Sequence, residues 1–145
     1  MTTLMFRNVD ADPSDPIDTW PHEAFQAAIE HGLVPDWQGI ADHLDQHPYG
    51  AAAATLADVL EYTEGAGAFL LRHRLQQARS TALNTVLAKQ AQELAGLVAG
   101  SSLTQRELAR RIGTSESRLS TWLSGRQAPT AQALARVRLA LSDAE

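Results

Sequence analysis

The sequence predicts an all-α protein, and three observations support that fold class. Apolar residues recur at intervals of three and four along most of the chain, which is the period of an amphipathic helix. No stretch alternates for long between apolar and polar residues, as a half-buried strand would. Glycine and proline stand between the periodic stretches, at positions where helices end.

Residues 1–80 are expected to form a helical region that follows an extended arm. Aspartate and proline are frequent in residues 1–19, and both favour turns. Helical spacing then predicts three helices, over residues 19–32, 35–48 and 49–65, with Asp36 as a candidate cap of the second. Their candidate core residues are Ala24, Phe25, Ala28, Ile29, Trp37, Ile40, Ala41 and Leu44.

A fourth periodic stretch begins at residue 66, and its residues Phe69, Leu70 and Leu71 are expected to be buried. The spacing continues to residue 99. The sequence leaves open whether residues 66–99 form one helix or two helices with a kink near Ser80.

Residues 100–142 carry the most regular pattern in the chain. After a glycine-serine break, two short helices are expected over residues 104–112 and 115–124, followed by a last helix over residues 130–142. Gly113 can adopt the positive φ that a tight turn between the first two requires, and Ser115 is a good N-cap. The side chains expected to face inward are those of Leu103, Leu108, Ala109, Ile112, Leu119, Trp122 and Leu123.

The net charge of −5 hides two halves of opposite sign. Residues 1–66 hold twelve acidic residues against Arg7 alone, a charge of −11, whereas residues 67–145 hold eleven basic residues against five acidic ones, a charge of +6. A basic half favours a polyanion as its partner. The acidic half is therefore expected to serve a different contact or only solubility.

The pattern from Leu103 onward resembles the helix-turn-helix of the lambda-repressor-like (Cro/XRE) DNA-binding family, with the match covering residues 81–142. The residues that carry the resemblance are Leu103-Thr104-Gln105, Glu107-Leu108-Ala109, Ile112-Gly113-Thr114, Leu119-Ser120-Thr121-Trp122, Gly125 and Pro129. The resemblance implies a five-helix lambda-repressor-like DNA-binding domain over residues 81–142. The charge and the apolar helix faces of the acidic helical region before it, residues 1–80, favour a role in interaction or dimerisation. Residues 6–24 are similar to the region that precedes this module in actinobacterial XRE-type regulators.

The second helix of such a unit enters the major groove of DNA with its N-terminal residues toward the base edges. The face opposite its apolar side carries Ser115, Glu116, Ser117, Arg118, Ser120 and Thr121. The resemblance implies that Glu116, Ser117 and Thr121 read bases, while Gln105 and Arg126 would hold phosphate. Glutamate can accept a hydrogen bond from cytosine, and arginine can reach guanine.

Several of these residues have a simpler interpretation. Glu107 is expected to pair with a nearby arginine. Arg110 and Arg111 suit a solvated helix face as well as they suit phosphate contact. Glu116 also suits the stabilisation of a helix N-terminus, a role compatible with base contact.

Other motifs were weighed as metal or catalytic sites. Asp10-x-Asp12-x-Ser14 begins like a calcium loop, but the glycine and the final glutamate that such a loop needs are missing. His43 and His47 have the spacing of a metal pair on a helix, although surface histidines are the favoured interpretation. With no cysteine and no nucleophile motif, the sequence predicts no enzyme, no metal and no cofactor.

Three functions are compatible with these patterns. They are a dimeric transcriptional repressor, an antitoxin that uses its acidic half against a basic toxin, and an adaptor that has lost DNA binding. Dimerisation is expected mainly in the N-terminal helices, whose apolar residues include Phe25, Trp37, Leu56, Leu60, Phe69 and Leu83. Without a secretory signal or an apolar run that could span a bilayer, a cytoplasmic protein with no membrane partner is expected.

Overall fold

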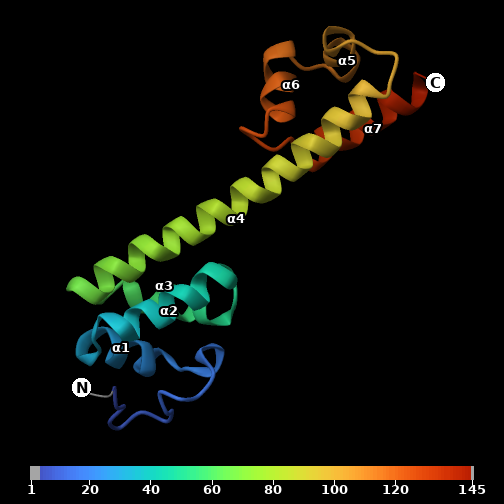
Figure 1. The fold of residues 1–145 in the computed structure, drawn as a ribbon. Helices are drawn as coiled ribbons and strands as arrows, with labels where there is room; N and C mark the ends of the chain where they lie inside the picture. Colours follow the sequence, from blue (N-terminus) through green and yellow to red (C-terminus); the bar gives the residue numbers. More distant parts are fainter. Residues whose placement is uncertain (1–3, 145) are drawn as a thin grey trace. The chain divides into compact units, whose positions relative to one another are not determined.

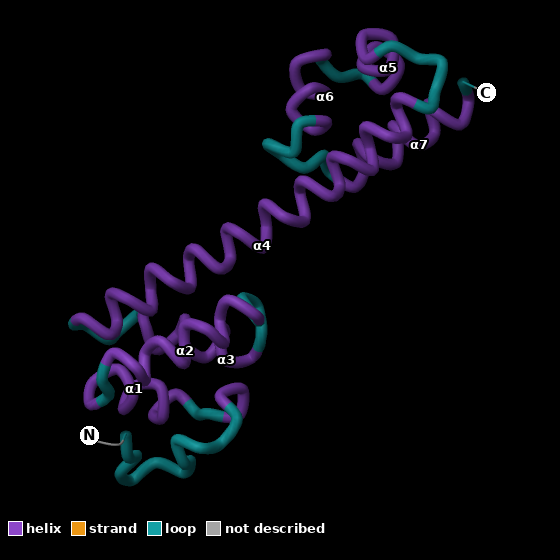
Figure 2. Tube along the Cα trace, viewed as in Figure 1, coloured by secondary structure: helices purple, strands orange, loops and turns teal. Residues whose placement is uncertain are grey.

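The structure is a computed structural model that describes residues 4–144, and within that range it contains helices and no strand (Figures 1 and 2). The all-α expectation is therefore confirmed. No helix in the described range is long and apolar enough to cross a membrane. The elements, in chain order, are η1 (Ile17–Thr19), α1 (His22–His31), α2 (Val34–Gln46), α3 (Ala51–Leu60), α4 (Ala66–Ala99), α5 (Gln105–Ile112), α6 (Glu116–Leu123) and α7 (Ala131–Asp143).

The chain divides into two compact units, Met1–Ala82 and Leu83–Glu145, which we call the N-terminal and C-terminal units. Helix α4 contributes its first half to one unit and its second half to the other. Residues 66–99 form one helix with no interruption at Ser80. The choice that the sequence left open is thereby settled in favour of a single helix.

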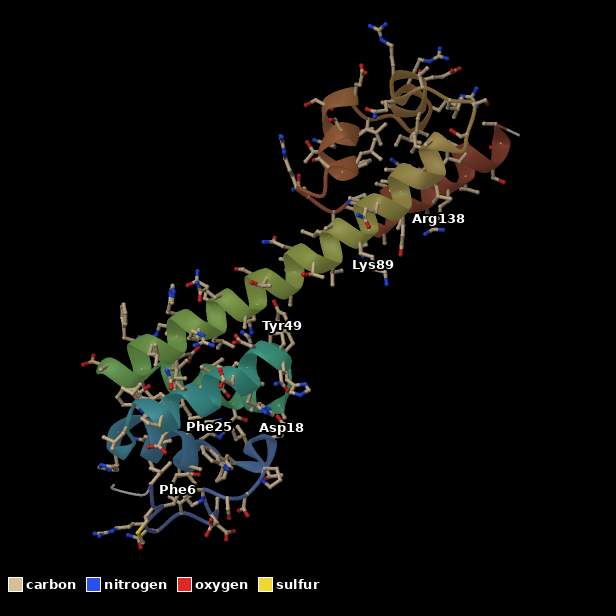
Figure 3. All side chains as sticks on the ribbon, in the orientation of Figure 1. Phe6, Asp18, Phe25, Tyr49, Lys89 and Arg138 are labelled. Atoms are coloured by element: carbon tan, nitrogen blue, oxygen red, sulfur yellow. The ribbon has the colours of Figure 1, made fainter. Side chains whose placement is uncertain are left out.

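The N-terminal unit has a core made by α1, α2, α3 and the start of α4. The candidate core residues of α1 and α2 are buried as predicted, and Trp37 is partly buried against them. Phe25 lies at the centre of this packing (Figure 3), next to Trp20 at 5.3 Å between ring centroids. Phe25, Leu56 and Leu60 are almost wholly buried here, so their apolar surface is unavailable to a dimer contact.

The cap of α2 differs from the expected one. The N-cap residue is Leu33, and the Asp36 carboxylate accepts a hydrogen bond from the Leu33 backbone N–H at 2.8 Å. Asp36 therefore stabilises the start of the helix from inside its first turn. The helix dipole also favours its negative charge at this end.

Phe69 corrects the expectation for the start of α4, because its side chain is 74% exposed and only Leu71 of the three apolar neighbours is fully buried. The buried face of α4 in this unit follows Ala68, Leu71, Leu75 and Ala78, at intervals of three and four. Adjacent residues are separated by about 100° around a helix, so Phe69 falls outside the face that Ala68 defines.

Contacts between distant residues close the N-terminal unit. Gly67 lets α4 approach Trp37 so closely that a Cβ at this position would lie 2.6 Å from the indole ring. The Trp37 Nε1–H donates to the Ala28 carbonyl at 2.9 Å. Arg72 donates to the Leu60 carbonyl at 2.6 Å, and Arg79 donates to the Pro48 carbonyl at 2.9 Å.

The C-terminal unit packs the end of α4 against α5, α6 and α7 around a second core. Its described residues hold four helical segments, one fewer than the five that the resemblance implies, because the sequence after residue 82 has only four periodic stretches. Trp122 is 7% exposed and belongs to the core, as predicted. The other core members predicted on and before α5 and α6 are buried or packed against the core: Leu103, Leu108, Ala109, Ile112, Leu119 and Leu123.

Candidate nucleic-acid interface

The turn between α5 and α6 forms as the sequence predicted. Gly113 ends α5 with φ +76°, in the left-handed region that glycine adopts without strain. The Ser115 hydroxyl then accepts a hydrogen bond from the Arg118 backbone N–H at 3.0 Å, which makes Ser115 the N-cap of α6. The hydroxyl of Thr104 caps α5 in the same way, at 3.2 Å from the Glu107 backbone nitrogen.

Packing against α5 fixes α6 on the core of the C-terminal unit. Ala109 is 2% exposed on α5, and its small side chain suits a close approach between the two helices. Leu108 and Leu119 are fully buried, and Trp122 completes the inward face of α6. One face of α6 is thus held by the core while the opposite face points to solvent.

The outward face of α6 is polar. Ser115, Glu116, Ser117, Arg118 and Ser120 are exposed, and Thr121 is half-buried. Within residues 4–144, the side chains of six predicted contact residues form no hydrogen bond or ion pair: Gln105, Glu116, Ser117, Arg118, Ser120 and Arg126. These side chains are therefore available to a ligand without loss of an internal contact.

Two of the predicted contact residues have bonds of their own. The Ser115 hydroxyl is engaged as the cap of α6, so its first role is structural. The Thr121 hydroxyl donates to the Ser117 carbonyl at 3.0 Å. Thr121 therefore presents a methyl group and acceptor lone pairs, but no free donor, to a partner.

The arginines of α5 share one carboxylate. Glu107 Oε1 lies 3.4 Å from Arg111 Nη2 and 3.9 Å from Arg110 Nη2, which confirms its expected pairing role. One acid cannot neutralise both guanidinium groups, and Arg106 is exposed without a carboxylate partner within the described part of the chain. Residues 103–129 hold five arginines against Glu107 and Glu116, so this segment keeps a positive charge.

Arg126 and Gln105 flank α6 and α5 at opposite ends of the motif. Gly125 turns the chain with φ +79°, and the Arg126 backbone N–H donates to the Thr121 carbonyl at 3.2 Å, so Arg126 is placed directly after α6. Gln105 is exposed in the first turn of α5, where backbone N–H groups favour an anion.

A hollow of about 350 Å³ beside α6 brings in residues that the sequence analysis passed over. Arg118 of α6 lines it together with Gln127 of the following loop and Arg136 of α7. Glutamine and arginine side chains suit an anion. They line one hollow only through the tertiary packing of the C-terminal unit, in which both α6 and α7 contact α5. No local sequence signal links Arg136 to the turn.

The metal motifs weighed from sequence have structural roles instead. His43 Nε2 lies 3.0 Å from Asp18 Oδ1, and the rings of His43 and His47 contact each other with 5.0 Å between centroids. Asp12 accepts hydrogen bonds from the Ser14 backbone and hydroxyl, which lowers its pKa. No three metal-ligating side chains gather anywhere in residues 4–144.

Comparison with known proteins identifies one part of the chain. No curated protein and no solved structure matches the sequence. Residues 101–141 match the family model described as helix-turn-helix, a model that covers α5, the turn, α6 and most of α7. That family consists of DNA-binding regulators, which are generally not enzymes. The C-terminal unit is therefore similar, over residues 101–141, to the Cro/C1-type helix-turn-helix of the XRE family.

Proposed function

We propose that the protein is a sequence-specific transcriptional regulator that binds duplex DNA as a homodimer and acts as a repressor. The observation that carries this proposal is the outward face of α6. Its side chains Glu116, Ser117, Arg118 and Ser120 have no internal partner within the described range, while the inward face of the helix is packed in the core. A helix presented in this way matches the shape of the major groove.

Base reading falls to the exposed residues of α6. Glu116 would accept from the amino group of cytosine, and Arg118 would donate to the acceptors of guanine. Thr121, whose hydroxyl hydrogen is already used, would offer its methyl group to the methyl of thymine. Ser117 and Ser120 are short and can contact either kind of edge, so they leave the preferred sequence open.

Phosphate contacts fix the register of α6 in the groove. Gln105 would hold one phosphate at the start of α5, and Arg126 would hold another directly after α6. These contacts supply affinity without sequence information. The acidic residues 1–66 are repelled by phosphate and contribute no such contact.

A homodimer follows from the symmetry of the sites that such proteins read. Two recognition helices must lie one turn of DNA apart, at about 34–36 Å, to bind two half-sites together. Repression needs only that the bound dimer occupies the site, and no activating surface has to be invoked.

An antitoxin function is the second candidate, and the charge of the N-terminal region favours it. Residues 1–66 carry −11, a surface that suits a strongly basic protein. The same helix-turn-helix would then regulate the pair of genes. A gene for a small basic protein beside this one would support the antitoxin role, and an isolated gene would favour the repressor.

Selection from a random duplex library with the purified full chain tests DNA reading directly. The expected result is one enriched motif with two-fold symmetry. The Glu116→Ala/Thr121→Ala double variant serves as control and should enrich a different or weaker motif. If no motif is enriched even at low salt, the proposal is contradicted.

A further inference from the structure

We propose that a second copy of this chain docks on an exposed stripe of α4 in the C-terminal unit, formed by Leu83, Val86, Gln90, Glu93 and Leu97. We call these residues the α4 stripe. The inference rests on the proposed function in one respect, namely that a symmetric operator calls for a dimer. It assigns the dimer contact to the second half of α4, so that only Leu83 of the apolar residues named from sequence for dimerisation belongs to it.

The spacing of the α4 stripe is that of a helix-pairing seam. Its residues follow one another at intervals of three, four, three and four, which places them on one face of α4. Leu83, Val86 and Leu97 are 53%, 52% and 45% exposed, although each is a large apolar side chain. Exposed apolar side chains in a row mark an interaction surface more often than single ones do.

The internal core of the C-terminal unit uses a different face of the same helix. Ala91, Leu94 and Val98 are at most 8% exposed, and Leu94 and Val98 pack against α5, α6 and α7. The α4 stripe lies beside this face and is not consumed by it. The apolar surface of α4 is thus wider than its own unit requires.

A hollow next to the α4 stripe provides the matching recess. It has a volume of about 380 Å³ and lies between α4 and α7. Leu134 and Arg138 line it from α7. Three residues of the stripe also line it, namely Gln90, Glu93 and Leu97. Projections and recess on one surface suit a two-fold contact, in which the same patch must complement itself.

The charges around the α4 stripe also favour a second copy over a strongly charged partner. Lys89 and Glu93 are the only charged residues between positions 83 and 99, and Arg138 stands on α7 (Figure 3). None of the three forms an ion pair within the described range. Two copies related by a two-fold axis can pair Glu93 of one copy with Lys89 or Arg138 of the other. A basic toxin would instead be repelled by Lys89 and Arg138.

The length of the α4 stripe sets the strength of the contact. Five positions make two heptads, which is short for a stable coiled coil. Gln90 occupies a central position, and a polar residue there fixes register at some cost in stability. The free chain should therefore associate weakly, and binding to two adjacent half-sites should strengthen the pairing.

Sedimentation velocity of the full chain over a wide concentration range tests the surface. The wild type should shift from monomer to dimer as concentration rises. Leu97→Lys and Val86→Lys should each weaken dimerisation about tenfold or more, since each puts a charge in the seam. Circular dichroism should show unchanged helix content, because both side chains are exposed.

Two matched controls sharpen the test. Leu139→Lys changes a leucine that is 66% exposed on α7 outside the stripe, and Phe69→Lys changes an exposed residue of the N-terminal unit. Both should dimerise like the wild type. A chain that stays monomeric at every concentration overturns the proposal and leaves the surface to another protein. Loss of the dimer in Phe69→Lys but not in Leu97→Lys overturns it in favour of the N-terminal unit.

A DNA titration separates this surface from the proposed function. Leu97→Lys should bind a single half-site as the wild type does and lose affinity only for the paired site. If the wild type dimerises through the α4 stripe but binds no DNA, the proposed function is wrong and the proposed dimer surface is supported. If the wild type binds DNA while the stripe variants dimerise normally, the proposed dimer surface is wrong and the proposed function is supported.

Discussion

The two units of this chain differ in how their helices are specified. In the C-terminal unit each of α5, α6 and α7 starts with a hydroxyl cap, from Thr104, Ser115 and Thr130, that accepts from the backbone three residues later. In the N-terminal unit the residues that precede η1, α1 and α3 supply no side-chain cap. Caps are local signals, so the starts of the helices in the C-terminal unit can be predicted from the sequence.

Contacts between distant residues do the corresponding work in the N-terminal unit. Asp18 accepts from the backbone N–H of Ala52 at 3.1 Å and contacts His43, which ties η1 to α2 and α3. Arg72 and Arg79 reach the carbonyls of earlier loops. The comparison shows that local caps start all three short helices of the C-terminal unit. In the N-terminal unit a local cap starts only α2, and contacts between distant residues hold the other elements.

The largest expected effect concerns charge, where the units also differ in sign. The DNA affinity of the full chain should fall by several decades as salt rises, with a log–log slope of about −0.9 for each phosphate contact. The arginines of the C-terminal unit carry this dependence. Fluorescence anisotropy at graded salt concentrations measures it, and an affinity that does not respond to salt would contradict the division of charge.

A pair of glycines in α4 tests the spatial encoding of the N-terminal unit. Gly67→Ala should lower the free energy of unfolding by about 1–3 kcal/mol, because the new Cβ meets the Trp37 ring. Gly96→Ala, on the same helix with nothing within 4 Å of its Cβ, should raise it by about 0.5–1 kcal/mol. Urea unfolding measures both, and equal effects would mean that α4 does not depend on close approach at Gly67.

These differences explain how far sequence reasoning reached. Gly113 and Ser115 could be predicted because a left-handed turn and a helix cap each demand particular residues locally. Phe69 could not be placed, since a run of apolar neighbours does not say which of them faces the core. The bond from Thr121 to the Ser117 carbonyl depends on a side-chain rotamer, and the presence of Arg136 and Arg118 at one hollow depends on the packing of α7. Neither leaves a trace in the sequence.

Thr114 provides a smaller test within the locally encoded unit. Its Oγ1 is shielded from solvent and has no hydrogen-bond partner in the structure described. Thr114→Val keeps the shape and removes this unsatisfied group, so stability should rise by about 1 kcal/mol. Thr121→Val is the matched control, because its hydroxyl is bonded to Ser117 and its loss should stabilise nothing. Thermal unfolding that ranks the two variants the other way would show that Thr114 has a partner.

The smallest effect concerns acid and the distant contacts of Asp18. The hydrogen bond with His43, then that from the Ala52 backbone, holds the pKa of Asp18 below its ordinary value. A depressed pKa in the folded state adds stability that is present at neutral pH and is lost as pH falls below the ordinary aspartate value. Asp18→Asn should make the free energy of unfolding, measured by urea unfolding at graded pH, depend less on pH in this range. Asp12 also has a lowered pKa, caused by its hydrogen bonds from Ser14. Asp12→Asn therefore measures, for comparison, how much a local contact adds to the pH dependence of stability.

The direct test of DNA reading by α6 is duplex-library selection repeated with single variants. Arg126→Ala should keep the preferred motif, weaken binding to all sequences alike and reduce the salt slope by about one for each copy bound. Glu116→Ala and Thr121→Ala should instead change the preferred motif and cost about 1–3 kcal/mol on the wild-type site. A changed motif with Arg126→Ala, together with an unchanged motif for both α6 variants, would contradict base reading by α6.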